Sequence, residues 1–82
     1  MSFPARFAPH VGAIIRTALE PDQREALHEA VLRACADPYS WPQADKYELD
    51  DSVRVITTPA AIVYYVVIPD PDPHLWVFSI TL

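Results

Sequence analysis

The stretch from Ala61 to Ile68 is an unbroken run of apolar, β-branched and aromatic residues, and it restricts the possible folds more than any other feature. Proline lies close to both ends, at Pro59 and Pro69. A short apolar run of this composition predicts a strand that is covered on both faces. Another part of the chain must therefore supply at least one cover.

Two helices are predicted upstream, because apolar residues recur there at positions i, i+3, i+4, i+7 and i+8. The first stripe, after Pro9, is Val11, Ile14, Ile15, Ala18 and Leu19. The second, after Pro21, is Leu27, Ala30, Val31, Ala34 and Cys35. Proline suits the first position of a helix, and the short link at Glu20 predicts an antiparallel helical hairpin. This hairpin is the expected cover for the strand.

Three further segments are predicted to be strands. Ser2 to Phe7 predicts an edge strand because Pro4 cannot donate to a ladder. Val53 to Thr58 is expected to form an antiparallel hairpin with the central run. The closing strand alternates, and one set is expected to face the helices: Trp76, Phe78, Ile80 and Leu82. Between helix and strand, residues 38–51 are expected to pack down through Tyr39, Trp41, Tyr47 and Leu49.

Together these elements predict one domain over residues 1–82, since a chain of 82 residues supports a single core. The fold class is α+β: a two-layer β-α-α-β-β-β arrangement with an antiparallel sheet packed against a helical hairpin.

Charge and cysteine content limit the functional classes. The net charge is −5 and only six residues are Lys or Arg, which argues against general nucleic-acid binding. A single cysteine excludes an internal disulfide and favours a reducing compartment. No signal peptide or membrane span is evident, so we expect a cytoplasmic protein.

In this order of elements the chain resembles the RelE/ParE superfamily of toxins from bacterial type II toxin–antitoxin modules. The matching landmarks are the breaks at Ala8-Pro9, Leu19-Glu20-Pro21 and Asp37-Pro38. Val63-Tyr64-Tyr65-Val66 resembles the family's RVIYxV strand, and Trp76-Val77-Phe78-Ser79-Ile80 resembles its VxVLxI strand. The resemblance implies the same fold and an antitoxin protein as partner, bound through strand addition or a helix in a groove.

The departures from the family pattern concern its ribonuclease site. Ile62 stands where the family commonly has an arginine, and Leu82 is the last residue where ribonuclease members continue through further basic and catalytic residues. By resemblance, the remaining candidates for catalysis are Arg54, Lys46 and Tyr65. Each candidate also has a structural interpretation. Arg54 can be a solvent-facing strand residue, and Lys46 can be an ion-pair partner of nearby carboxylates. One of Tyr64 and Tyr65 is expected in the core, because adjacent strand residues face opposite sides of the sheet.

Other reactive side chains carry weaker signals. His74 follows Asp70-Pro71-Asp72-Pro73 and is a loop histidine that could serve as acid or base. Asp70, Asp72 and His74 would need a fourth ligand to hold a metal, so we expect no metal site. His28 and Cys35 are two helical turns apart and cannot pair, and no cofactor motif is present.

Three hypotheses follow. The first is a RelE/ParE-like toxin component, or a degenerate relative, that acts through protein binding and is held by an antitoxin. The second is a ribosome-dependent mRNA endonuclease that uses Arg54 and Lys46 with a tyrosine. The third is a non-toxic interaction module, for instance a homodimer.

Overall fold

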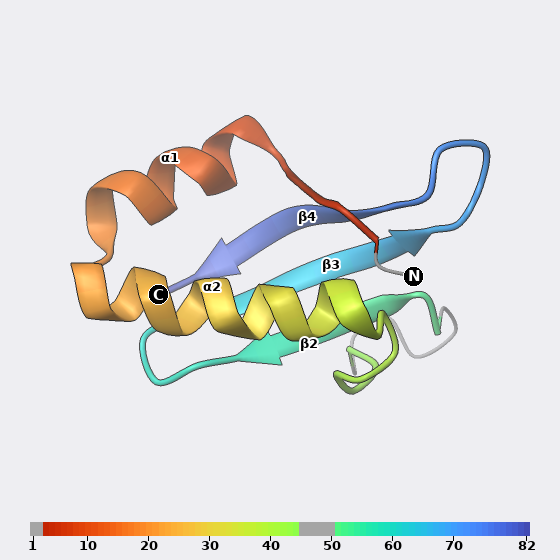
Figure 1. The fold of residues 1–82 in the computed structure, drawn as a ribbon. Coiled ribbons are helices and arrows are strands. Elements are labelled where there is room, and N and C mark those ends of the chain that lie inside the picture. The colour runs from red at the N-terminus through yellow and green to blue at the C-terminus, as the bar shows by residue number, and fades with distance from the viewer. Residues whose placement is uncertain (1–2, 45–50) are drawn as a thin grey trace.

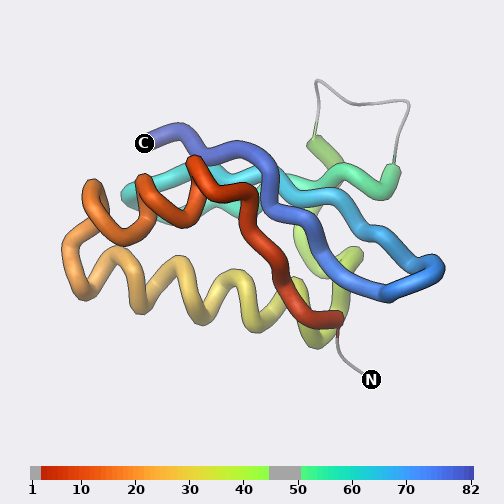
Figure 2. The backbone as a smooth tube through the Cα atoms, turned by 90° about the horizontal axis from the view of Figure 1, so that it is seen from above, coloured from red at the N-terminus to blue at the C-terminus, as the bar shows by residue number. Residues whose placement is uncertain are grey.

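The computed structural model of the protein describes residues 3–44 and 51–82. The elements follow the predicted order: β1 (Ala5–Phe7), α1 (Pro9–Ala18), α2 (Pro21–Ala36), β2 (Val53–Thr57), β3 (Ile62–Ile68) and β4 (His74–Thr81). Both helices lie over one face of the sheet (Figure 1), and the view from above separates the helical layer from the strand layer (Figure 2). The two-layer α+β prediction is confirmed. None of the described helices is long and apolar enough to cross a membrane.

The four strands form one sheet in the order β1-β4-β3-β2. Strands β2, β3 and β4 are antiparallel neighbours, as their short links predict. Strand β1 instead runs parallel to β4, with Ala5 opposite Leu75 and Phe7 opposite Val77. The sheet is therefore mixed, which corrects the expectation of a purely antiparallel sheet. Parallel pairing is allowed here because the helices and two strands separate β1 from β4 in the sequence.

Local sequence signals set the helix boundaries. Pro9 and Pro21 occupy the first turns of α1 and α2. Glu20 and Gln23 form a capping box at the start of α2, and the Glu20 backbone N–H donates to the Gln23 side-chain oxygen at 2.8 Å. The second helix ends before Asp37, where the following proline disfavours helical backbone.

The core lies between the helical layer and the sheet. The predicted stripe of α2 is confirmed, with Leu27, Val31 and Ala34 buried and its other members packed against the cluster. The largest completely buried side chains are Tyr65, Ile56, Leu75, Val11, Val63 and Val77. Burial of this apolar surface is the main favourable term in folding.

A bulge changes which residues of β4 face the helices. Tyr65 pairs with Val77 whereas Tyr64 pairs with Ser79, so Phe78 is an extra residue on β4. Before the bulge Leu75 and Val77 face the core, each 1% exposed, and Ile80 packs against it afterwards. The prediction was therefore wrong for Phe78, which does not belong to the core cluster, and Leu82 is exposed, at 62%. Of the predicted set, Trp76 and Ile80 are partly buried and pack against the core cluster.

The other face of the sheet has no described helix over it. Alternate residues of β3, from Ile62 through Tyr64 to Val66, lie on this face and are exposed or partly exposed. The Tyr64 ring stacks with that of Phe78, with centroids 6.4 Å apart and planes at 22°. The expected second cover of the central strand is thus not supplied by the described part of the chain.

Candidate functional site

Two of the three residues predicted to form a catalytic site are neighbours in the structure. Arg54 on β2 and Tyr65 on β3 are cross-strand partners, so their side chains leave the same face of the sheet. That face is the one covered by the helices, because Tyr65 belongs to the core. Lys46, the third, lies outside the described residues.

The guanidinium of Arg54 is engaged by the segment that follows α2. Its Nε donates to the backbone carbonyl of Asp51 at 2.8 Å, and Nη1 donates to that of Trp41 at 3.3 Å. Its Cζ lies 4.8 Å from the centroid of the Tyr39 ring, in cation–π range. These contacts give Arg54 a structural task, which is to hold the chain segment beside the edge strand.

Tyr65 is completely buried, and its hydroxyl donates to the carbonyl oxygen of Pro38 at 2.6 Å. Burial raises the pKa of the phenol well above its ordinary value, although the nearby charge of Arg54 acts in the opposite direction. The hydroxyl is therefore protonated at neutral pH and already has an acceptor. A group in this state is well suited to anchor a loop.

Trp41 packs the segment after α2 against the fold, as predicted. Its indole Nε1 donates to the Ala30 carbonyl of α2 at 3.1 Å, and the Arg33 guanidinium lies 4.6 Å from its ring centroid. Farther along, Ala44 donates to the Val53 carbonyl at 3.1 Å, which extends the sheet beyond β2. By contrast, Tyr39 is 52% exposed, and Tyr47 and Leu49 lie outside the described residues.

The His74 turn is tied to β1. The Asp72 carboxylate accepts from Arg6 at 2.6 Å, and the backbone carbonyl of Asp72 lies 2.6 Å from Nδ1 of His74. Within residues 3–44 and 51–82, no cluster of three His, Cys, Asp or Glu side chains could hold a metal ion.

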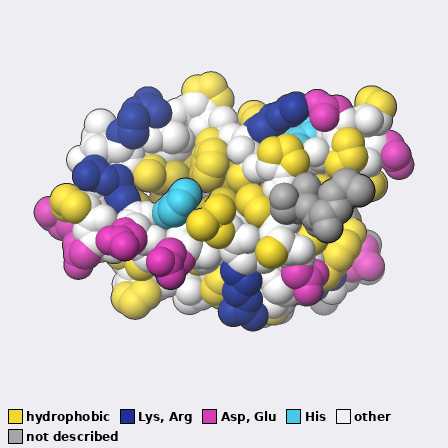
Figure 3. All heavy atoms as spheres, in the orientation of Figure 1, with side chains coloured by type: hydrophobic (Ala, Val, Ile, Leu, Met, Phe, Trp, Pro, Cys, Tyr) yellow, Lys and Arg dark blue, Asp and Glu magenta, His cyan; other side chains and the backbone are white. Residues whose placement is uncertain are grey.

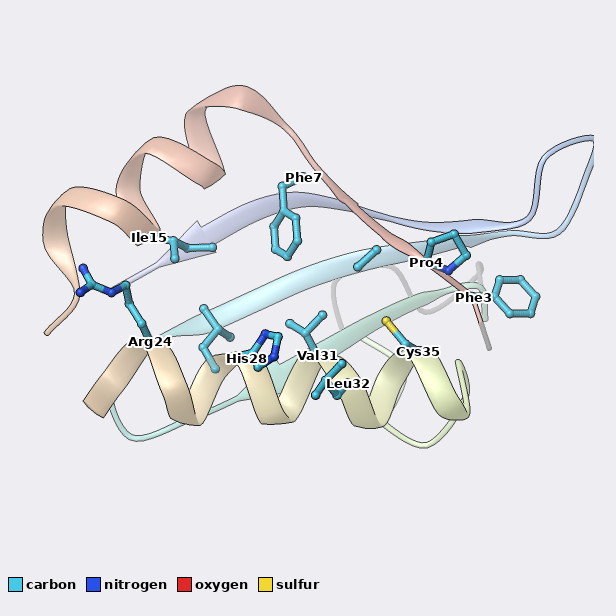
Figure 4. Close-up of a pocket in the computed structure, with 11 residues that line it drawn as sticks. Phe3, Pro4, Phe7, Ile15, Arg24, His28, Val31, Leu32 and Cys35 are labelled. Atoms are coloured by element: carbon cyan, nitrogen blue, oxygen red, sulfur yellow. The ribbon is translucent and has the colours of Figure 1, made fainter. Parts of the chain in front are cut away.

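A groove lies elsewhere, between β1 and α2. Its volume is about 450 Å³. Phe7 extends from β1 towards α2, and Ile15 lies at the end formed by α1 (Figure 4). The other apolar contributors are Phe3, Pro4, Ala5, Leu27, Val31 and Leu32. Phe7 and Leu32 are 37% and 52% exposed, so the groove presents large apolar side chains to solvent.

The polar side chains of the groove are few and contain no carboxylate. Arg24 and His28 are the charged or titratable nitrogen groups among the lining residues. Cys35 also lines it, and burial raises the pKa of its thiol, which disfavours the reactive thiolate. In Figure 3 hydrophobic side chains gather in a hollow between α2 and the β1–α1 segment, and acidic side chains lie along its lower rim. The lining of the groove is thus mainly apolar with Arg24 among its few polar side chains, and acidic side chains flank it.

Two residues could have indicated this groove in the sequence, but the predicted apolar stripe of α2 drew attention to the core instead. Leu32 adjoins the predicted stripe of α2 without belonging to it, and Phe7 sits on a strand with only one neighbour. Large apolar residues outside a core stripe indicate a contact surface when they gather in one place. Their meeting across β1 and α2 depends on the tertiary arrangement.

The chain was also compared with known proteins, and no protein-family model, curated protein or solved structure matched it. What the structure shows is a small α+β fold, with two helices on a mixed sheet of four strands.

Proposed function

We propose that this chain is the toxin component of a RelE/ParE-like toxin–antitoxin module, or a degenerate relative of one, and that it acts by binding protein. The observation that carries the proposal is the open apolar groove between β1 and α2. Exposed apolar surface of this kind marks sites of interaction with other proteins. The β-α-α-β-β-β order is what the sequence resemblance implies, and it supports the same conclusion.

The contacts of Arg54 and Tyr65 favour protein binding over phosphoryl transfer. A metal-free ribonuclease site needs cations and proton-transfer groups that can reach the phosphate in the transition state. Here Nε and Nη1 of Arg54 donate to backbone carbonyls, and the Tyr65 hydroxyl is buried against Pro38. A chain of net charge −5 also repels RNA.

Controlled expression in a bacterial host tests the proposal. We expect the chain to arrest growth, and we expect co-expression of its antitoxin, sought in the adjoining reading frame, to restore growth. Arrest should persist in Arg54→Ala, provided that circular dichroism shows the variant folded. Arg16→Ala on α1 removes an exposed arginine and is the control for the loss of one positive charge.

Two outcomes would decide against this function. Normal growth at high expression of folded protein would refute a toxin and favour the non-toxic interaction module. Arrest that needs Arg54 and comes with cleavage of ribosome-bound message would establish the endonuclease alternative instead.

A further inference from the structure

The groove between β1 and α2 is apolar over most of its length and has an arginine at one end. Arg24 and Ile15 lie at that end, and Phe3 and Cys35 lie at the other (Figure 4). Sites for small molecules have volumes of about 300 to 1,000 Å³ and are mostly apolar, with a few polar groups that fix the ligand. The volume of this groove, about 450 Å³, and its lining both match that description.

We propose that this groove binds a medium-chain fatty acid, which is an unbranched alkyl chain with one carboxylate. The tail lies along Phe7, Val31 and Leu32, and the carboxylate binds the Arg24 guanidinium. This inference goes beyond the proposed function and is independent of it, because binding of the ligand requires neither toxicity nor a partner protein.

Arg24 is held in place by the backbone of the helical hairpin. Its Nη1 donates to the Arg16 and Leu19 carbonyls at the end of α1, both at 3.2 Å. The guanidinium is a planar fork, and Nε and Nη2 are the pair of parallel donors on its other side. A carboxylate accepts from such a pair through two hydrogen bonds, which are stronger than bonds between neutral groups. Arg24 can therefore bind one carboxylate without losing its present contacts.

The length of the groove fits a chain of medium length. Along α2 the lining runs from Arg24 to Cys35, which at 1.5 Å per residue is about 16 Å. Carbon–carbon bonds of about 1.5 Å give an extended alkyl chain a rise of about 1.3 Å per carbon, so about twelve carbons cover about 14 Å. Phe7 and Leu32 are 37% and 52% exposed, and the tail removes part of this apolar surface from water.

The charges of the groove favour a single carboxylate over a phosphate. Arg24 is the one lining residue with a permanent positive charge, and no lining residue is acidic. A phosphate group carries a charge of about −1.5 to −2, which one guanidinium does not balance. Glu25 and Glu29 of α2 are exposed and do not line the groove, so water and salt screen their repulsion of the ligand.

Titration of the full chain with dodecanoate, below its critical micelle concentration, tests the inference. Isothermal titration calorimetry should show saturable binding. Dodecanol has the same tail without the charge, and octanoate has the charge with a shorter tail. Each should bind about tenfold more weakly or worse. Amide NMR signals of Phe7 and Leu32 should shift with dodecanoate, whereas that of Ile62, on the opposite face of the sheet, should not.

Two variants separate the contact with the carboxylate from the contact with the tail. Arg24→Gln should weaken dodecanoate binding about tenfold and change dodecanol binding by less than about twofold. Leu32→Ser should weaken binding of both ligands by about threefold or more. The matched controls are Arg16→Gln, which removes an exposed arginine outside the lining, and Ile62→Ser, at a 40% exposed position of β3. Both controls should change Kd by less than about twofold, with folding checked by circular dichroism.

Three results would overturn the inference. Equal affinity for dodecanoate and dodecanol, or full affinity of Arg24→Gln for dodecanoate, would show that no carboxylate contact exists. A lack of saturable binding would show that the groove is not a ligand site. Sedimentation of the protein with phosphatidylglycerol vesicles, without binding of monomeric dodecanoate, would indicate attachment to a lipid surface instead.

The growth assay separates this inference from the proposed function. Growth arrest without dodecanoate binding would overturn the inference and leave the toxin proposal standing. Dodecanoate binding that depends on Arg24, without growth arrest, would refute the toxin and support the ligand site.

Discussion

Replacing Tyr65 by phenylalanine tests whether this residue anchors the fold or takes part in catalysis. The variant keeps the buried ring and removes only the hydroxyl that donates to Pro38 at 2.6 Å. A hydrogen bond contributes about 0.5 to 1.5 kcal/mol net. The carbonyl left behind belongs to a half-buried residue that water can reach, so the added penalty is small. We expect a loss of about 1 to 1.5 kcal/mol in the free energy of unfolding.

Thermal and urea denaturation followed by circular dichroism measure this loss. For a domain of this size each kcal/mol lowers Tm by about 4 to 8 °C. The urea m-value should stay unchanged, because the same surface is exposed on unfolding. Tyr39→Phe is the matched control, since Tyr39 is 52% exposed, and we expect it to change stability by less than about 0.5 kcal/mol.

The raised pKa of Tyr65 adds a pH dependence with a defined sign. Burial raises the folded-state pKa above the unfolded value, which is near 10 for tyrosine. Above pH of about 10 the unfolded chain loses this proton while the folded chain keeps it, so stability falls by up to about 1.4 kcal/mol per pH unit. The contribution is fully present below that pH. Tyr65→Phe should lack this part of the alkaline loss.

The anchoring role also predicts the activity of the variant. Growth arrest by Tyr65→Phe should follow the amount of folded protein and nothing else. A variant as stable as the wild type that no longer arrests growth would refute the structural role and favour a catalytic tyrosine.

Three further substitutions test local features by urea denaturation. Gly12→Ala should stabilise α1 by about 0.5 to 1 kcal/mol, because the new methyl group meets only the flexible end of a side chain, at 3.3 Å; a loss of stability would contradict this. Gln23→Ala removes half of the capping box and should cost about 0.5 to 1 kcal/mol, with an exposed Glu25→Ala as control. Asp72→Ala breaks an ion pair whose side chains are 51% and 63% exposed, and should change stability by less than about 1 kcal/mol; a larger loss would show that the pair fixes the hairpin tip to β1.

The sequence was sufficient for elements that depend on local periodicity. Both helices begin at the predicted prolines, and the α2 stripe around Leu27 and Val31 is buried as its spacing requires. The face of β4 was not predictable in this way. Its alternation is regular in sequence, and the inserted Phe78 becomes visible only when β4 is aligned with β3.

The positions of the candidate site residues relative to one another depend on tertiary structure more than the helices and strands do. Family resemblance selected Arg54 and Tyr65, and the structure makes them cross-strand partners that bind the segment after α2. The groove joins β1 to α2 across an intervening helix, and no local pattern specifies that contact. The parallel pairing of β1 with β4 is likewise a long-range property, because strand order follows from packing and not from alternation.

The pairing of β1 with β4 also determines when the groove between β1 and α2 can form during synthesis. Ala5 is synthesised 70 residues before its strand partner Leu75. Contacts between residues so far apart in sequence form late, because a large loop must close first. One wall of the groove is therefore unfinished until β4 has docked, although α2 is already made. A partner that recognises this groove would distinguish the completed fold from the nascent chain.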